Sequence, residues 1–225
     1  MSRPSADAPR RATSVISIEP RQGATSHLVV LLHGVGASAE SFQEVARVLA
    51  SGLPSAEFLV PDGFHPFDGG GDGRQWFSVR GVTEENRAAR VREAGAEVSR
   101  WIDGELASRG LGGDRLAVIG FSQGAILAAW LALHRAPRPA AAVMLSGRVA
   151  EDQPAERGAT APEVFIGHGE RDPMMPVAQV AQSTRVLQAW GARVTARTYP
   201  GLGHHLDARE LGDVAEFLKR VLEQP

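Results

Sequence analysis

The pentapeptide Gly120-Phe121-Ser122-Gln123-Gly124 constrains the fold of this chain more than any other feature, because two different kinds of segment meet there. The apolar run at residues 116–119 is typical of a buried strand, and the apolar stretch at 125–131 is typical of a buried helix. The two flanking glycines let a strand and a helix approach closely around the bend. The pattern therefore predicts a strand, a sharp turn with Ser122 at its apex, and a helix, an arrangement that exposes a serine hydroxyl for nucleophilic attack.

A serine nucleophile needs a base and an acid, and both have candidates further along the chain. Asp172 lies in a polar loop after the apolar run 164–166, at the end of a predicted strand where catalytic groups of α/β sheets gather. The sequence Gly203-His204-His205 follows a second predicted strand at 194–199. The order Ser, Asp, His is that of α/β-hydrolases. It predicts a triad of Ser122, Asp172 and His204, with His205 as the alternative base.

Backbone donors for an oxyanion are expected after the first long core strand. The apolar run 28–32 leads into His33-Gly34-Val35-Gly36, where the glycines let the backbone approach a substrate carbonyl. The expected donors are the N–H groups of Val35 and Gln123.

Strand-like and helix-like segments alternate along the chain, which predicts an α/β fold with a mostly parallel sheet and helices on both faces. We expect a single domain at residues 14–225 after a disordered tail at 1–13. Strands are predicted at 15–18, 28–32, 57–60, 116–119, 140–145, 164–166 and 194–199. Helices are predicted at 41–49, 83–108, 125–131, 177–190 and 208–222, the first opened by a capping box from Ser41 to Glu44.

The composition argues against nucleic-acid binding, membrane insertion and metal binding. The 24 basic and 26 acidic residues give a net charge of −2, which does not suggest a nucleic-acid-binding protein. The chain has no cysteine, no signal-peptide pattern and no apolar stretch long enough to span a membrane, so we expect a cytoplasmic protein without integral membrane association. No metal or cofactor is expected, because His204 and His205 are adjacent and lack further ligands at metal-binding spacing. The sequence is compatible with a homodimer as well as a monomer.

The glycine-rich segment 67–73 fits neither a phosphate-binding loop nor a calcium loop, since its spacing differs from both. We interpret it as a flexible loop that lets Trp76 and Phe77 fold over the site and bind substrate.

These motifs resemble the phospholipase/carboxylesterase family of α/β-hydrolases, which includes acyl-protein thioesterases and bacterial carboxylesterases. The resemblance covers roughly residues 26–222. It rests on four segments: Leu32-His33-Gly34-Val35-Gly36, the Ser122 pentapeptide, Gly167-His168-Gly169 leading to Asp172-Pro173, and Gly203-His204. Gly73-Arg74-Gln75-Trp76-Phe77-Ser78 is similar to a Trp-Phe segment near the family's substrate pocket. The resemblance implies esterase activity with Ser122 as nucleophile, Asp172 as acid and His204 as base.

The sequence leaves two other functions open: a serine peptidase of the same fold, and a non-catalytic binding protein built on it. Within the esterase interpretation, the segment 147–162 is short, polar and interrupted by Pro and Gly, so no large cap is expected. An open site favours short- to medium-chain acyl esters in solution, with thioesters and lysophospholipids as further candidates.

Overall fold

A sheet of seven strands forms the centre of the protein: β1 (Val15–Ile18), β2 (His27–Leu32), β3 (Ala56–Pro61), β6 (Leu116–Phe121), β7 (Ala141–Leu145), β8 (Glu163–Gly169) and β9 (Arg193–Tyr199). The computed structural model describes residues 14–150 and 162–223, so the expected tail at 1–13 lies outside the described residues. The strand order is β1-β3-β2-β6-β7-β8-β9, and every neighbouring pair is parallel except β1 and β3. The predicted mostly parallel sheet is confirmed.

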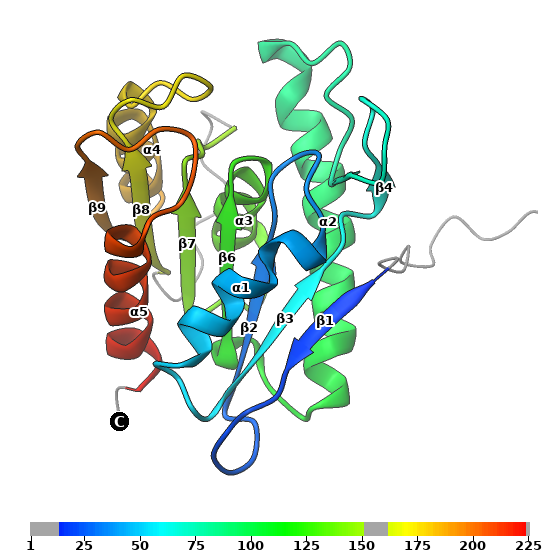
Figure 1. Ribbon diagram of the computed structural model, residues 1–225, viewed down its shortest axis with the longest axis vertical. Helices are drawn as coiled ribbons and strands as arrows, with labels where there is room; N and C mark the ends of the chain where they lie inside the picture. The colour runs from blue at the N-terminus through cyan, green and yellow to red at the C-terminus, as the bar shows by residue number, and fades with distance from the viewer. Residues whose placement is uncertain (1–13, 151–161, 224–225) are drawn as a thin grey trace, which may run out of the picture.

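Helices cover both faces of this sheet (Figure 1). They are α1 (Ala39–Ala50), α2 (Glu84–Ser108), α3 (Gln123–His134), α4 (Ala178–Ala189) and α5 (Ala208–Leu222). Helices α1 and α5 pack on one face, where Phe42 and Phe217 join the same apolar cluster as Phe165 of β8. Helices α2 and α3 share a cluster on the opposite face that includes Trp101 and Leu127. Because both faces are covered, the central strands are apolar on both sides.

Helix α1 begins earlier than the sequence predicted. Ser38 is its N-cap, and the capping box joins Ser38 to Ser41 in place of the expected pair Ser41 and Glu44. The Asp62 carboxylate also accepts a hydrogen bond of 2.8 Å from the Ala39 N–H, which stabilises the first turn from a distant part of the chain.

The glycine-rich segment is the connection of a small hairpin, β4 (His65–Pro66) and β5 (Arg74–Gln75). The Asp68 carboxylate accepts hydrogen bonds from the Ser78 hydroxyl and the N–H groups of Val79 and Arg80. The Phe67 N–H donates to the Gly73 carbonyl across the loop. The segment expected to be a flexible loop is therefore anchored at several points.

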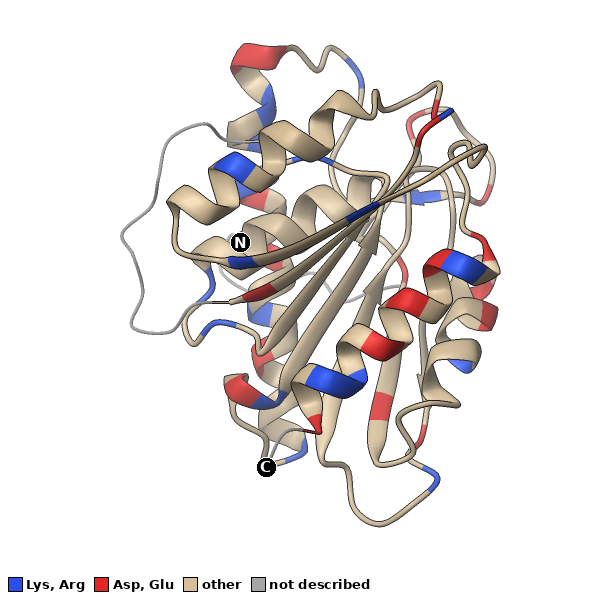
Figure 2. Cartoon of the chain, turned by 90° about the vertical axis from the view of Figure 1, so that its left-hand side faces the viewer, with Lys and Arg blue, Asp and Glu red and all other residues tan. Residues whose placement is uncertain are grey.

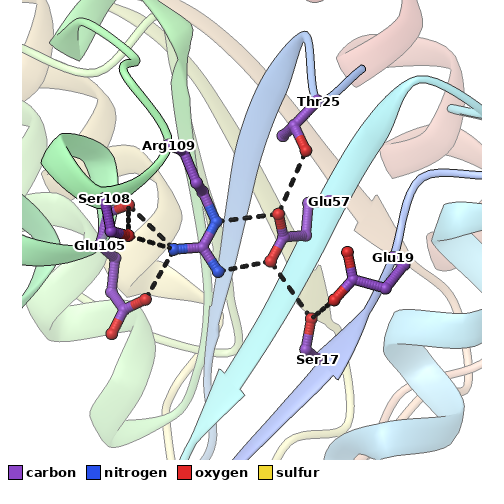
Figure 3. A network of polar contacts seen from close by, with 7 residues as sticks. All are labelled: Ser17, Glu19, Thr25, Glu57, Glu105, Ser108 and Arg109. Atoms are coloured by element: carbon purple, nitrogen blue, oxygen red, sulfur yellow. Dashed lines mark hydrogen bonds and ion pairs between the residues drawn. The ribbon is translucent and has the colours of Figure 1, made fainter. Parts of the chain in front are cut away.

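A partly buried ion-pair network joins the end of α2 to the start of β3 (Figure 3). Arg109 contacts both oxygens of Glu57, with its Nε 2.8 Å from Oε2 and an Nη 2.5 Å from Oε1, and it also contacts Glu105. Glu57 further accepts hydrogen bonds from Ser17 and Thr25. Hydrogen bonding to Arg109 lowers the pKa of the Glu57 carboxyl, so it is ionised at neutral pH. This network lies at the amino ends of the strands, opposite the site described next.

Charged residues lie mainly on helices and loops, and acidic and basic positions are interspersed along α5 on the face shown in Figure 2. Among the described residues, no helix is both long enough and apolar enough to cross a membrane.

Candidate active site

Ser122 occupies the turn between β6 and α3 with φ 52° and ψ −113°, a backbone conformation that residues other than glycine rarely adopt. A Cβ at Gly120 would lie 2.1 Å from the Gly124 carbonyl oxygen, and one at Gly124 would lie 2.0 Å from that of Leu32. Only glycine fits at either position. The Ser122 N–H donates to the Leu145 carbonyl, which fixes the turn to the end of β7. The predicted strand, turn and helix are confirmed.

The structure brings the side chains of Ser122, His204 and Asp172 together from the ends of three strands. His204 Nε2 lies 3.0 Å from the Ser122 hydroxyl, and His204 Nδ1 lies 2.6 Å from Asp172 Oδ2. An ionised carboxylate can only accept, so Nδ1 carries the proton and Nε2 is left to accept from the serine hydroxyl. His205 is exposed and lies outside this chain of hydrogen bonds. The Phe121 ring packs against His204, with ring centroids 4.9 Å apart.

Asp172 is held by its own turn. Its Oδ1 accepts hydrogen bonds of 2.8 Å from the N–H groups of Met174 and Met175, which leaves Oδ2 for His204. Burial opposes ionisation, but the hydrogen bonds from His204 and the two N–H groups outweigh it, so the pKa of Asp172 lies below its ordinary value. The carboxylate is therefore ionised and oriented at neutral pH.

The two expected backbone donors belong to segments that adjoin the serine. Gln123 is the first residue of α3, so its N–H has no carbonyl partner within the helix. On the other side, a Cβ added to Gly34 would lie 3.4 Å from Ser122 Cβ and 3.2 Å from the Phe121 ring. The loop that carries the Val35 N–H is therefore packed directly against the nucleophile turn.

The two aromatic residues expected to fold over the site are buried instead: Trp76 is 1% exposed and Phe77 is 8% exposed. The Trp76 indole packs in the core beside Phe64 and donates a hydrogen bond to the His33 carbonyl. Both aromatics line an open groove of about 1020 Å³ between the β4–β5 hairpin and α2, and the residues lining it do not include Ser122 or His204. In this structure Trp76 is therefore packed into the core beside the site, and the folding of Trp76 and Phe77 over bound substrate stays a prediction.

Sequence reasoning missed two buried polar residues at this edge of the sheet. His168 lies on β8, and its Nε2–H donates 2.8 Å to the Met175 carbonyl, the same turn that holds Asp172. Glu210 lies in the first turn of α5 and is fully buried. The Gly-His-Gly pattern around position 168 was visible in the sequence, but only the pairing of β8 with its neighbours shows what it contacts. Glu210 gave no signal, because it sits among other charged residues of an amphipathic helix.

No group of three or more His, Asp or Glu side chains is arranged to hold a metal ion in the part of the chain that the structure describes.

A sequence model of the phospholipase/carboxylesterase family matches residues 13–222, which is nearly the whole chain. The chain is 31% identical over 195 residues to Esterase YpfH of Escherichia coli K12, covering 87% of this chain and 83% of that protein. It is 28% identical to Acyl-protein thioesterase 1 of Eremothecium gossypii, covering 94% and 95% of the two chains.

The fold is also similar to that of a solved enzyme. The crystal structure of esterase PE8 matches with a TM-score of 0.85 and 25% identity, covering 94% of this chain and 99% of that one. The sequence and structural similarities agree over almost the full length. The chain therefore belongs to the phospholipase/carboxylesterase family of α/β-hydrolases and is an enzyme of the carboxylic ester hydrolase class.

Proposed function

We propose that the protein is a serine carboxylesterase that hydrolyses short- to medium-chain acyl esters through a Ser122–His204–Asp172 triad and an acyl-enzyme intermediate. The observation that carries this proposal is the continuous hydrogen-bonded path from the Ser122 hydroxyl through His204 to Asp172, with distances of 3.0 and 2.6 Å. Such a path is what general-base activation of a serine requires.

In the first half of the reaction, Ser122 Oγ attacks the ester carbonyl carbon while His204 Nε2 takes its proton. Asp172 stabilises the resulting imidazolium. The N–H groups of Val35 and Gln123 donate to the oxyanion of the tetrahedral intermediate. His204 then gives its proton to the departing alcohol as the carbon–oxygen bond breaks, which leaves the acyl group on Ser122.

In the second half, His204 takes a proton from water, and the hydroxide attacks the acyl carbon. Collapse of the second tetrahedral intermediate returns the proton to Ser122 and releases the carboxylic acid. The same residues serve both halves, so replacing any one of them affects both.

A fluorophosphonate probe tests the nucleophile directly. Wild type should be labelled at Ser122, and Ser122→Ala should fold normally, escape labelling and lose ester hydrolysis by several orders of magnitude. Labelling with hydrolysis of peptides but not esters would favour a serine peptidase. A wild-type protein that neither reacts with the probe nor turns over esters would favour a non-catalytic binding protein.

We propose that Phe77 limits the length of the acyl chain that the site accepts. Its carbonyl accepts a hydrogen bond from the side chain of Gln123, the residue after the nucleophile, so we propose that its ring lines the acyl site. Hydrolysis of p-nitrophenyl esters of increasing chain length should peak at short to medium acyl groups, and Phe77→Ala should shift the peak toward longer ones. An unchanged profile in Phe77→Ala would remove Phe77 from the acyl site. Thioesters and lysophospholipids belong in the same panel, since one relative is a thioesterase by name.

A further inference from the structure

Both ends of the Gln123 side-chain amide are hydrogen-bonded within the protein. Its amide oxygen accepts from the Trp76 N–H at 2.8 Å, and its amide nitrogen donates to the Phe77 carbonyl at 2.8 Å. The residue is 4% exposed. Because both ends of the amide are occupied, the side chain cannot rotate without losing both bonds. The residue that offers one proposed oxyanion donor is therefore fixed to a segment 47 positions earlier.

The Trp76 side chain hydrogen-bonds to the segment that carries the other proposed donor. The indole Nε1–H donates 2.8 Å to the His33 carbonyl, and the indole and imidazole rings lie 5.2 Å apart. His33 immediately precedes Gly34 and Val35. One residue thus contacts both sides of the serine, through its backbone N–H on the Gln123 side and through its indole on the Val35 side.

His33 transmits this contact to the donor itself. The Gly63 N–H donates to His33 Nε2 at 2.9 Å, so Nδ1 carries the proton and donates to the Gly34 carbonyl at 2.7 Å. Burial lowers the pKa of His33, which keeps this neutral form at neutral pH. The Gly34 carbonyl and the Val35 N–H belong to one planar peptide, so holding the oxygen also sets the direction of the N–H.

We propose that Trp76 is a positioning residue for oxyanion stabilisation: it fixes the N–H groups of Val35 and Gln123 relative to each other before substrate binds. This inference rests on the proposed function. Donors that are oriented in advance stabilise charge in the transition state without reorganising. Loss of this fixed orientation should therefore lower kcat while leaving KM nearly unchanged.

The test replaces Trp76 with Phe, which removes the indole N–H and keeps an aromatic ring in the core. We expect kcat to fall about tenfold with KM within about twofold, less than the ~10²–10³-fold loss typical of removing a donor outright, because both N–H groups are still present. The affinity for a trifluoromethyl ketone, which forms an oxyanion adduct with the serine, should weaken by the same factor.

Trp101→Phe is the matched control. Trp101 belongs to the same apolar cluster and also contacts Phe64, at 6.4 Å between ring centroids, but makes no hydrogen bond to the site among the contacts of the described residues. It should lower the melting temperature without changing kcat or ketone affinity. If Trp76→Phe does not fold, 3-benzothienylalanine at position 76 replaces the N–H with sulfur and keeps the ring shape.

Unchanged kcat and ketone affinity in a folded position-76 variant would overturn the proposal, as would an equal loss in Trp101→Phe. Failure of the proposed function looks different, because wild type itself would then be inactive toward esters and unreactive with the fluorophosphonate.

Discussion

The Glu210 carboxyl group lies directly against the backbone of Gly167, with Oε1 2.5 Å from the position that a Cβ at residue 167 would occupy. Both carboxyl oxygens are buried and have no hydrogen-bond partner among the described residues. Burial, reinforced by Asp207 and Asp213, raises the pKa of Glu210 to about 8. The folded protein therefore holds a neutral carboxylic acid beside the strand that leads to Asp172.

We expect Glu210→Gln to stabilise the protein at alkaline pH. The pKa of Glu210 is raised above its ordinary value of 4.5, so the folded state binds more protons than the unfolded state between pH 4.5 and about 8. The free energy of unfolding contributed by this group thus falls as the pH rises through that window. Urea unfolding should give similar stabilities for wild type and variant at pH 5, and an advantage of about 2–4 kcal/mol for the variant at pH 8.

Glu216→Gln is the control, because Glu216 is exposed on the same helix and its replacement should leave this pH dependence intact. A difference between wild type and Glu210→Gln that does not change from pH 5 to pH 8 would contradict burial of a neutral Glu210.

Replacing the two adjacent histidines should have very different effects. His204→Ala should lower kcat/KM by about 10⁴-fold or more, since His204 contacts both Ser122 and Asp172. His205→Ala should stay within about threefold of wild type, because an exposed residue outside the chain of hydrogen bonds contributes little to the chemistry. Steady-state hydrolysis of a p-nitrophenyl ester measures both. The opposite ranking would transfer the role of base to His205.

The Arg109–Glu57 pair should contribute to stability and not to turnover. Glu57→Gln leaves Arg109 without its closest partner and should lower the free energy of unfolding by about 1–3 kcal/mol, less than for a fully buried pair because Arg109 is partly exposed to solvent. Because hydrogen bonding to Arg109 lowers the pKa of Glu57, the stability that the pair gives wild type is present above the ordinary pKa and is lost as the pH falls. Denaturant titrations at pH 7 and pH 4 measure both effects.

The exposed pair Glu44–Arg47 provides the comparison, with Glu44→Gln expected to change stability by less than about 0.5 kcal/mol. A Glu57→Gln variant as stable as Glu44→Gln would show that the Arg109–Glu57 pair is dispensable for stability.

Two glycines of helix α2 should respond to alanine in opposite directions. A Cβ at Gly95 would lie 2.2 Å from the Trp130 ring, so Gly95→Ala should cost about 1–3 kcal/mol as the ring is displaced. A Cβ at Gly104 would meet nothing within 4 Å, so Gly104→Ala should gain about 0.5–1 kcal/mol from helix propensity. Thermal unfolding of the two variants shows whether each substitution raises or lowers stability. A stabilised Gly95→Ala would mean that α2 and Trp130 pack more loosely than described.

The strands could be predicted from the sequence because parallel strands covered on both faces are continuous apolar runs, as at 28–32 and 116–119. The Ser and Asp candidates were found because each comes after such a run, whereas the His candidate follows β9, an edge strand of mixed apolar and polar residues. The end of β8 was missed, since Gly167, His168 and Gly169 do not look like strand residues.

Contacts between distant parts of the chain were beyond the reach of local patterns. The first turn of α1 makes an additional hydrogen bond to Asp62, and the Trp76 indole is held by a hydrogen bond to a residue 43 positions away. The Arg109–Glu57 pair spans 52 positions. Each of these is a polar contact whose partner only the folded topology supplies.

Because of the order of strands in the sheet, activity of the proposed site would report whether the β8–β9 edge has docked during refolding. Val35 follows β2, Ser122 follows β6, Asp172 follows β8, and His204 comes after β9 at one edge of the sheet. A partly folded chain with β2, β3 and β6 in place but β8 and β9 undocked would present the serine without its base. Recovery of turnover after dilution from denaturant should therefore lag behind recovery of helical circular dichroism whenever that edge docks last.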